Sequence, residues 1–263
     1  MRRKEYDIFV FDLYGTLADI RTNEDKPGLW RKMSEMYSSL GAHYSPTELK
    51  KNYLLICRRN AEQVQAEGVR SYGEEFLGEP DLTAVFQDLF RQKGISCSRE
   101  RAADFAGFFR ILSREKLKLY EGVKETLKKM RGAGKRVYLL SNAQGDFTRP
   151  EIELLGLKDC FDGILISSEE GCRKPSPVFY RRLIVRYGLS PKNCLMMGND
   201  MNTDIKGAKA VGMDTLYIHT ESSPQLTGKP EADYVVLDGN WHKAVEILME
   251  VAGLCRLQSY YRE

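Results

Sequence analysis

Side chains able to do chemistry stand at the ends of four short apolar segments of this chain. The first is Asp12, which directly follows an apolar Ile-Phe-Val-Phe run. Gly15 permits a tight turn just beyond it, and the hydroxyl of Thr16 is placed to hydrogen-bond to the Asp12 carboxylate and orient it. Asp is also a common loop residue, so this position becomes informative only together with the other three.

The second and third positions offer groups that suit an anion. Ser141 and Asn142 follow an apolar run and provide a hydroxyl and a backbone N–H for an oxyanion, although Ser-Asn is also ordinary turn chemistry. Lys174 is followed by Pro175 and Pro177, which stiffen its segment. We expect the Lys174 ammonium near the other groups; the alternative is a solvated loop lysine.

The fourth position holds a pair of acids. Asp200 and Asp204 are four residues apart at the start of an expected helix, so they share one face of it. Acids at a helix start also interact favourably with the helix dipole, which explains them without any function. Together, the four positions would bring a carboxylate, a hydroxyl, an ammonium and two acids to one point.

Short apolar runs alternate with helical patterns along most of the chain. This alternation predicts an α/β fold, a Rossmann-like parallel sheet covered by helices on both faces. In such sheets, ligands bind beyond the carboxyl ends of the strands. The expected strands span residues 6–11, 136–140, 163–166, 194–197, 215–218 and 234–237, and expected helices include 123–131, 177–187 and 201–211.

Residues 18–117 carry helical signals and little else. Apolar side chains from Leu29 to Leu40 repeat at three- and four-residue spacing. Ser45 followed by Pro46 is typical of a helix start, because Ser caps well and Pro fits the first turn. Two more helices are expected at 82–90 and 102–117, and a loop at 68–81.

The expected domain organisation follows from these two patterns. We predict a core of residues 1–17 plus 118–263, interrupted after its first strand by an all-helical cap of residues 18–117. An insert of this size is not expected to bury a large core of its own. It should therefore pack over the site as a lid.

Composition excludes several other classes of protein. The 263 residues are 42% hydrophobic and 29% charged, with a net charge of +3 and no basic arm, so nucleic acid is not an expected partner. No apolar run reaches the ~18 residues of a membrane span, and we expect a cytoplasmic protein. Six scattered cysteines and three unclustered histidines do not predict a zinc site.

The four segments, in this order, resemble the signature of the haloacid dehalogenase superfamily. That signature is an Asp-led motif after strand 1, a Ser or Thr after strand 2, a Lys in the next segment and an acidic pair after strand 4. The resemblance covers nearly the whole expected core. The position of the helical insert is also similar to that of the superfamily's C1-type cap.

The resemblance implies a mechanism of covalent catalysis. Asp12 would attack the substrate, and water would then hydrolyse the aspartyl intermediate. Thr16 would orient Asp12, Ser141 and the Asn142 backbone would hold phosphoryl oxygens, and Lys174 would neutralise charge shared by substrate and nucleophile. The implied substrate is a small phosphorylated metabolite.

The resemblance also implies a bound Mg²⁺. Its ligands would be the carboxylates of Asp12 and Asp200 and the backbone carbonyl of Tyr14, with Asp204 in support. Carboxylate and carbonyl oxygens together with waters are what Mg²⁺ prefers.

Tyr14 departs from the usual phosphatase pattern. Most phosphatases of the superfamily carry there a second Asp that acts as general acid and base, and the unperturbed pKa of Tyr is about 10. General acid–base catalysis is typically worth ~10²–10⁴-fold. A phosphatase without it should be slow on alkyl phosphates and less impaired on aryl or acyl phosphates.

Two alternatives remain open at this point. The Asp-x-Tyr-Gly-Thr-Leu motif resembles metal-independent 2-haloacid dehalogenases, whose cap Arg binds the substrate carboxylate; Arg58 or Arg59 could serve. Against this, three nearby carboxylates repel one another unless a cation neutralises them. The second alternative is a binding or regulatory module that has lost its catalytic acid. The oligomeric state is expected to be monomer or homodimer.

Overall fold

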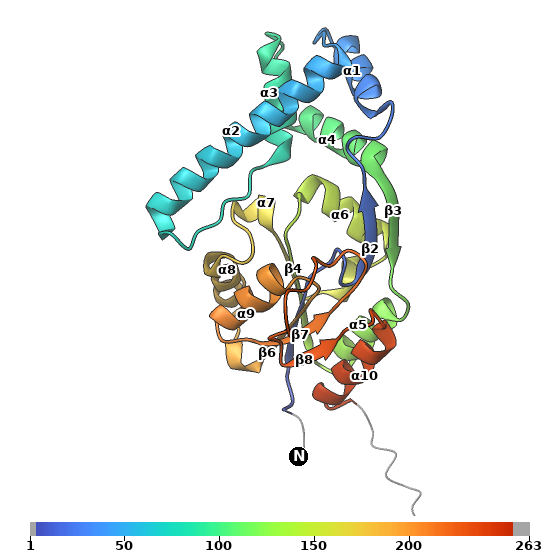
Figure 1. Ribbon diagram of the computed structural model, residues 1–263, viewed down its shortest axis with the longest axis vertical. Helices are drawn as coiled ribbons and strands as arrows, with labels where there is room; N and C mark the ends of the chain where they lie inside the picture. Colours follow the sequence, from blue (N-terminus) through green and yellow to red (C-terminus); the bar gives the residue numbers. More distant parts are fainter. Residues whose placement is uncertain (1–3, 255–263) are drawn as a thin grey trace, which may run out of the picture.

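A six-stranded parallel sheet forms the centre of the computed structural model, which describes residues 4–254 (Figure 1). The strand order is β5-β4-β1-β6-β7-β8, so β1 lies inside the sheet between β4 and β6. The strands are β1 (Ile8–Phe11), β4 (Arg136–Ser141), β5 (Gly163–Ile166), β6 (Cys194–Gly198), β7 (Asp214–Ile218) and β8 (Tyr234–Val236).

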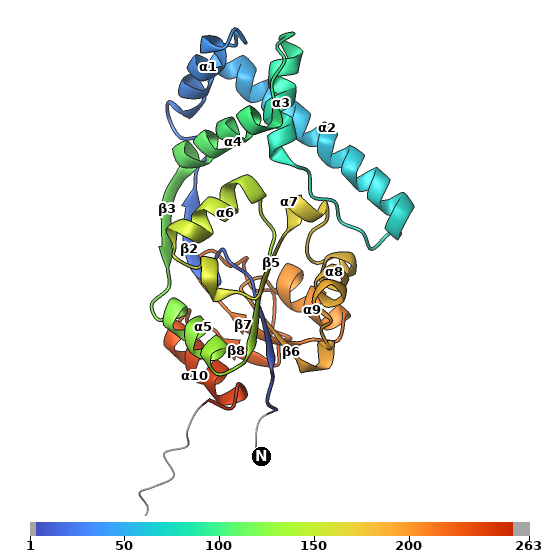
Figure 2. The same cartoon turned by 180° about the vertical axis from the view of Figure 1, so that it is seen from behind.

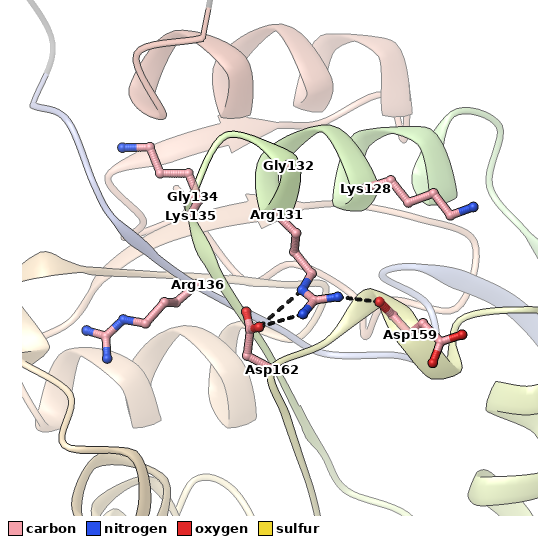
Figure 3. Close-up of a pocket in the computed structure, with 8 residues that line it drawn as sticks. All are labelled: Lys128, Arg131, Gly132, Gly134, Lys135, Arg136, Asp159 and Asp162. Atoms are coloured by element: carbon pink, nitrogen blue, oxygen red, sulfur yellow. Dashed lines mark hydrogen bonds and ion pairs between the residues drawn. The ribbon is translucent and has the colours of Figure 1, made fainter.

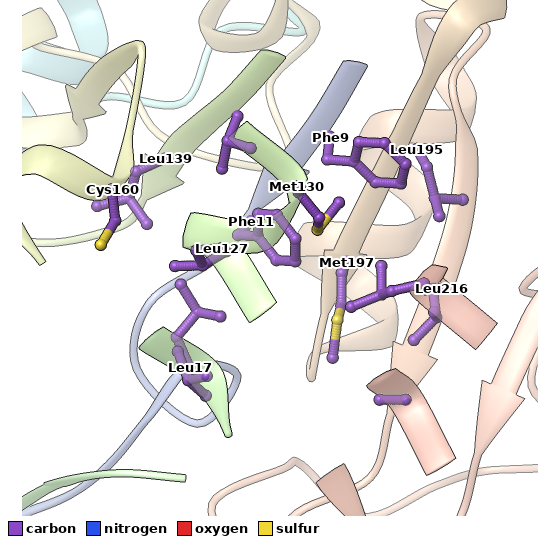
Figure 4. Close-up of a cluster of buried hydrophobic side chains, with 14 of the residues drawn as sticks. Phe9, Phe11, Leu17, Leu127, Met130, Leu139, Cys160, Leu195, Met197 and Leu216 are labelled. Carbon is purple, nitrogen blue, oxygen red and sulfur yellow. The ribbon is translucent and has the colours of Figure 1, made fainter. Parts of the chain in front are cut away.

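Helices cover both faces of this sheet. Alternate residues of a strand point to opposite faces, and in β1 all four are buried. Phe9 and Phe11 belong to one apolar cluster, which Figure 4 shows, whereas Ile8 and Val10 belong to another. The first cluster includes α5 (Val123–Gly132) and α10 (Trp241–Val251), and the second includes α8 (Pro177–Tyr187) and α9 (Lys206–Ala210).

The predicted α/β core is confirmed. Each of the six predicted strands is present, with ends that differ by at most two residues from those expected. The helix expected at 201–211 is split into a π-helical turn, Met201–Ile205, followed by α9. Two helices that we did not anticipate are α6 (Gly145–Leu154) and α10. The remaining short elements are α7 (Ser167–Glu170) and the 3-10 turns Lys158–Cys160 and Pro191–Asn193.

Four helices lie between β1 and the rest of the core in sequence. They are α1 (Leu29–Ser39), α2 (Pro46–Tyr72), α3 (Leu82–Gln92) and α4 (Arg99–Ser113), and we call them the helical insert. Ser45 and Glu48 form a reciprocal capping box at the start of α2. Figures 1 and 2 show the insert above the carboxyl-end edge of the sheet.

The expectation that the insert could not bury a large core of its own was wrong. Its helices enclose an apolar cluster rich in aromatic rings, including Trp30, Tyr37, Tyr53, Phe86 and Phe109. Several of these rings are in direct contact; those of Tyr53 and Phe109, for example, have centroids 5.3 Å apart. Because each aromatic side chain buries a large apolar area, a few of them suffice to form a core between four helices.

The region 18–117 is also not all helical. Ala18–Thr22 (β2) and Arg114–Leu119 (β3) form an antiparallel ribbon, so the helix expected at 102–117 ends at Ser113. The sequence of β3 alternates between charged and apolar residues near its end, which fits a strand better than a helix. This ribbon connects the insert to the core (Figure 2).

A second connection runs through the segment between α2 and α3. Helix α2 continues to Tyr72, beyond the start of the loop expected at 68–81. Phe76 is only 3% exposed and packs into the core cluster that contains Ile8 and Val10. The backbone N–H of Arg173 donates to the carbonyl of Leu77 over 2.9 Å. The insert is therefore fixed to the core beside the segment that carries Lys174.

None of the helices within residues 4–254 is long and apolar enough to cross a bilayer.

We predict that Gly68→Ala destabilises the protein by about 1–3 kcal/mol, the usual cost of overpacking. A Cβ at Gly68 would lie 1.8 Å from the ring of Phe76, which anchors the segment to the core. Gly107→Ala in α4 is the matched control, because a Cβ there meets nothing within 4 Å. It should stabilise the protein by up to about 1 kcal/mol. Urea unfolding measures both; equal effects of the two substitutions would contradict the anchoring of Phe76.

Candidate active site

A cavity of about 330 Å³ lies where β1, β4 and β6 end. Six of the side chains expected at the site line it, and Thr16 and Ser141 are buried. The predicted lining residues are Asp12, Tyr14, Asn142, Lys174, Asp200 and Asp204, and those not predicted are Ile20, Asn199, Thr203, Ser222 and Pro224. The parallel sheet thus brings all four sequence segments to one edge, as expected from the carboxyl ends of its strands.

The ammonium of Lys174 lies between two carboxylates at the centre of the site. Its Nζ is 2.7 Å from Oδ1 of Asp12 and 2.7 Å from Oδ1 of Asp204, and its side chain is only 1% exposed. Burial alone would lower the pKa of Lys174, but Asp12 and Asp204 outweigh burial and raise the pKa. Lys174 therefore stays charged.

Asp204 is the more deeply buried partner of Lys174. Burial raises the pKa of its carboxyl to about 6, with Lys174 opposing the shift and Asp12 adding to it. Its other oxygen, Oδ2, accepts the backbone N–H of Asp200 over 3.0 Å. Gly198 makes this close approach possible, because a Cβ there would lie 2.3 Å from the Asp204 carboxyl carbon.

Hydrogen bonds orient the two reactive side chains. The hydroxyl of Thr16 lies 3.2 Å from Oδ2 of Asp12 and 3.2 Å from Oδ1 of Asn199, so it can orient the Asp12 carboxylate. The side chain of Asn142 bonds to both backbone polar groups of Lys174, accepting its N–H over 2.8 Å and donating to its carbonyl over 3.0 Å. We expected the backbone of Asn142 to act on an oxyanion and did not anticipate that its side chain fixes Lys174.

The hydroxyl of Ser141 has no hydrogen-bond partner. Among the buried side-chain oxygen and nitrogen atoms of residues 4–254, the Oγ of Ser141 is the one without a hydrogen-bond partner. A buried polar group without a partner costs about 1–3 kcal/mol and calls for an explanation. Because Ser141 ends β4 next to Asn142, an oxygen of a bound ligand is a natural partner for it.

The three aspartates do not form one cluster of ligands. No group of three or more His, Cys, Asp or Glu side chains in the described part of the chain is arranged to hold a metal ion. Both oxygens of Asp204 already have partners, in Lys174 and the Asp200 backbone. Asp200 caps the turn that follows, its Oδ1 accepting the N–H of Asn202 over 2.8 Å. Because its two oxygens are engaged in this way, Asp204 does not join the carboxylates of Asp12 and Asp200 as a metal ligand, as we had expected.

Tyr14 points its hydroxyl at a carboxylate that sequence reasoning did not identify. The hydroxyl donates to Oε2 of Glu151 over 2.5 Å and lies 3.1 Å from the hydroxyl of Thr148. Burial and the negative charge of Glu151 raise the pKa of Tyr14. Burial by itself would raise the pKa of Glu151, but Arg110, with the hydrogen bonds from Tyr14 and Arg114, outweighs burial and lowers it. Glu151 lies inside a helix, where neither motif nor strand end marks it.

A larger hollow of about 470 Å³ lies at the opposite, amino-terminal edge of the sheet. It is lined by several basic residues, but Figure 3 shows Lys128 and Arg136 pointing away from each other. Arg131 is bonded to Asp162 and to the carbonyl of Asp159. These cations do not converge on a ligand position.

Comparison with known proteins agrees with this geometry. Residues 6–212 match the family model for haloacid dehalogenase-like hydrolases, which covers well over half of the chain. The chain belongs to this family. The solved structures that it resembles share its fold.

The related proteins are mostly named as phosphatases. A phosphoserine phosphatase of Thermus thermophilus is 30% identical over 154 residues, which are 58% of this chain and 59% of that protein. The human N-acylneuraminate-9-phosphatase is 27% identical over 229 residues, covering 86% of this chain and 88% of that protein. The chain spans only 54–59% of the length of three of the relatives that it matches, among them the Thermus protein.

Solved structures match over nearly the full length. A HAD phosphatase from Thermococcus onnurineus superposes with a TM-score of 0.57 at 20% identity, over 94% of this chain and 98% of that chain. A dehalogenase with an intermediate complex gives a TM-score of 0.55 at 18% identity, with the same coverage. At these identities, the likeness establishes the fold alone.

Neither arginine proposed for a dehalogenase lines the cavity. Arg58 and Arg59 are exposed on α2, and Arg59 is paired with Asp88 of α3. Of the two roles open to these arginines, the structure therefore agrees with that of helix surface residues.

We predict that Lys174→Met destabilises the protein by about 3–5 kcal/mol at pH 7.5, because it leaves two buried carboxylates without their cation. Without Lys174, burial would hold the pKa of Asp204 above its value in the unfolded chain, so the folded form would bind more protons than the unfolded form. The loss of stability should therefore shrink as the pH falls toward 5. Urea unfolding at both pH values measures this. Lys158→Met, at an exposed ion pair with Glu153, should change neither value; a penalty for Lys174→Met that is independent of pH would contradict the argument.

Proposed function

We propose that this hydrolase is a Mg²⁺-dependent phosphatase that acts on a small phosphorylated metabolite through an aspartyl-phosphate at Asp12. The observation that carries the proposal is the Lys174 ammonium, held 2.7 Å from the Asp12 carboxylate in the cavity. Ser141, whose buried hydroxyl has no partner, directly precedes the lining residue Asn142. A carboxylate nucleophile, a fixed cation and a free hydrogen-bond donor are what phosphoryl transfer requires. The many phosphatases among the relatives agree with it.

Each residue has a role in this mechanism. The Asp12 carboxylate attacks phosphorus, oriented by Lys174 on one oxygen and by Thr16 on the other. Ser141 and the backbone of Asn142 hold the phosphoryl oxygens. Because Lys174 stays charged, it offsets the negative charge shared by nucleophile and substrate. Water then hydrolyses the aspartyl-phosphate and restores Asp12.

The donor set fits a Mg²⁺ ion. Asp12, Tyr14 and Asp200 line the same cavity, and two carboxylates with one backbone carbonyl leave room for the waters that Mg²⁺ retains. When bound, the ion would neutralise charge on the phosphoryl group. In this proposal Asp204 supports the site indirectly, because it holds the ammonium of Lys174 and the N–H of Asp200.

The leaving group must depart without help from Tyr14. Its hydroxyl is committed to Glu151, and its pKa is raised rather than lowered, so it is a poor acid or base at neutral pH. The proposed substrates are therefore phosphates with good leaving groups, such as aryl or acyl phosphates. Among the residues that line the cavity, Lys174 is the one with a basic side chain. Its ammonium is already paired with the carboxylates of Asp12 and Asp204.

A metal-independent dehalogenase remains the second candidate, on the observation that Tyr14 stands where most phosphatases of the family have Asp. A third candidate is a binding module without turnover. The assay that separates them measures hydrolysis of p-nitrophenyl phosphate with and without Mg²⁺, and chloride release from 2-chloropropionate without metal.

We predict Mg²⁺-dependent phosphate release that is abolished in Asp12→Asn, because the amide cannot act as the nucleophile. Chelation by EDTA should abolish turnover, and added Mg²⁺ should restore it. Chloride release without metal would replace the proposal by the dehalogenase. A folded protein that shows neither activity would favour the binding module. Full activity of Asp12→Asn would eliminate the covalent mechanism.

We also predict that kcat/KM for an aryl phosphate exceeds that for an alkyl phosphate by about 10²-fold or more, the lower range of general acid–base catalysis. The comparison uses p-nitrophenyl phosphate and glycerol 1-phosphate under the same conditions. Equal values would mean that another group protonates the leaving group.

A further inference from the structure

The buried carboxylate of Glu151 joins three separate parts of the molecule. It lies on α6 of the core and is only 2% exposed. From the helical insert, Arg110 of α4 donates to both of its oxygens, over 2.8 and 3.0 Å. From the start of β3, Arg114 donates over 2.9 Å. From the loop that carries the nucleophile, Tyr14 donates over 2.5 Å.

Apolar packing places this cluster at the contact between insert and core. Phe147, one turn before Glu151 on α6, is buried in the apolar cluster of the insert rather than in that of the core. The guanidinium carbon of Arg110 lies 5.5 Å from the centroid of the Phe147 ring and 5.4 Å from that of the Tyr14 ring. The contact of α4 with α6 therefore both covers Phe147 and places Arg110 against Glu151.

The charges make the two contacts depend on each other. A buried carboxylate is costly unless cations and hydrogen bonds satisfy it. Arg110 and Arg114 satisfy Glu151, and they are held on the insert and on the ribbon that leads to it. With the insert away from α6, Glu151 would lose the two hydrogen bonds from Arg110 that hold its carboxylate in position. Tyr14 would then lose its acceptor.

Tyr14 is two residues from Asp12, so its position bears directly on the nucleophile. We propose that Glu151 is a positioning residue that couples docking of the helical insert to the geometry of the Asp12 loop. In the docked form, Arg110 fixes Glu151 and Glu151 fixes Tyr14. Docking of the insert over α6 thereby adds the Tyr14 contact to the core contacts that already hold this loop, such as those from Thr220 to the Gly15 carbonyl and from Trp241 to the Thr16 carbonyl. This rests on the proposed function only in assigning the nucleophile to Asp12.

A nearby ion pair provides a matched control. Arg149, also on α6, is bonded to Glu169 of α7 over 2.5 and 2.6 Å. Both residues belong to the core, so this pair does not connect it to the insert. Glu169→Gln removes the same charge as Glu151→Gln from a bidentate pair on the same helix. It leaves Tyr14 and Arg110 untouched.

The test measures amide hydrogen exchange in two regions of the full-length protein, residues 12–18 and residues 105–116. Arg110→Met should speed exchange in both regions by about tenfold or more, the ratio expected for loss of a hydrogen bond to a charged group. Tyr14→Phe, which removes one hydroxyl and no charge, should speed exchange only in 12–18. Glu169→Gln should change neither region.

The coupling is quantified by a double variant. If Glu151 acts on the loop through Tyr14, then Glu151→Gln combined with Tyr14→Phe should exchange no faster in 12–18 than Glu151→Gln alone. Multiplying effects, or fast exchange in 105–116 of Arg110→Met with an unchanged 12–18, would overturn the coupling. If Glu151→Gln does not fold, the comparison of Arg110→Met with Tyr14→Phe still decides it.

Turnover provides the second readout. Tyr14→Phe should lower kcat about tenfold, with little change in KM or in melting temperature, whereas a purely structural role would lower the melting temperature and leave kcat unchanged. The exchange measurements do not depend on activity. Absence of phosphatase activity together with coupled exchange would therefore refute the proposed function and leave the coupling intact.

Discussion

The buried ammonium of Lys174 is the interaction on which the rest of the site depends. Asp12 and Asp204 come from loops that follow two neighbouring strands, β1 and β6, and both carboxylates lie 2.7 Å from Lys174. Without a cation between them, two carboxylates this close would repel each other and one would take up a proton. With it, both carboxylates are held against one cation at the cavity. The Lys174 ammonium, which holds these two carboxylates in place, would also neutralise charge on a bound phosphoryl group.

A buried ion pair of this kind contributes little to stability by itself, because removing two charges from water costs about as much as their attraction returns. The protein reduces this cost with hydrogen bonds to the surrounding backbone. Asn142 fixes the backbone of Lys174, and the N–H of Asp200 satisfies the second oxygen of Asp204. The rigid parallel sheet beneath them holds these partners in register. The buried ion pair is therefore better explained by a role in the site's chemistry than by a contribution to the stability of the fold.

The sequence predicted those parts of the site that stand directly after buried strands. Asp12, Ser141 and Asp200 could be placed because parallel strands end at one edge, and because the alternation of strands and helices was clear. Glu151 and Arg110 could not, since both lie inside amphipathic helices where a charged residue normally faces water. Glu151 and Arg110 are 41 residues apart in sequence, and packing of α4 on α6 brings them together. The β2–β3 ribbon was missed because its charged residues hide a short alternating pattern.

Two buried charge clusters in the described part of the chain have different consequences. Lys174 and its two aspartates belong to core segments, so their geometry is set when the sheet folds. Glu151 with Arg110 and Arg114 spans core and insert, so its geometry also depends on docking. Tyr14 lies between the clusters: its chain neighbour Asp12 belongs to the first, and its hydroxyl belongs to the second. Replacing the usual Asp by Tyr at this position removes a proton donor from the reaction but creates a link that reaches the insert. A small acid at position 14 could donate a proton. A long aromatic side chain with a terminal hydroxyl is suited to reach Glu151.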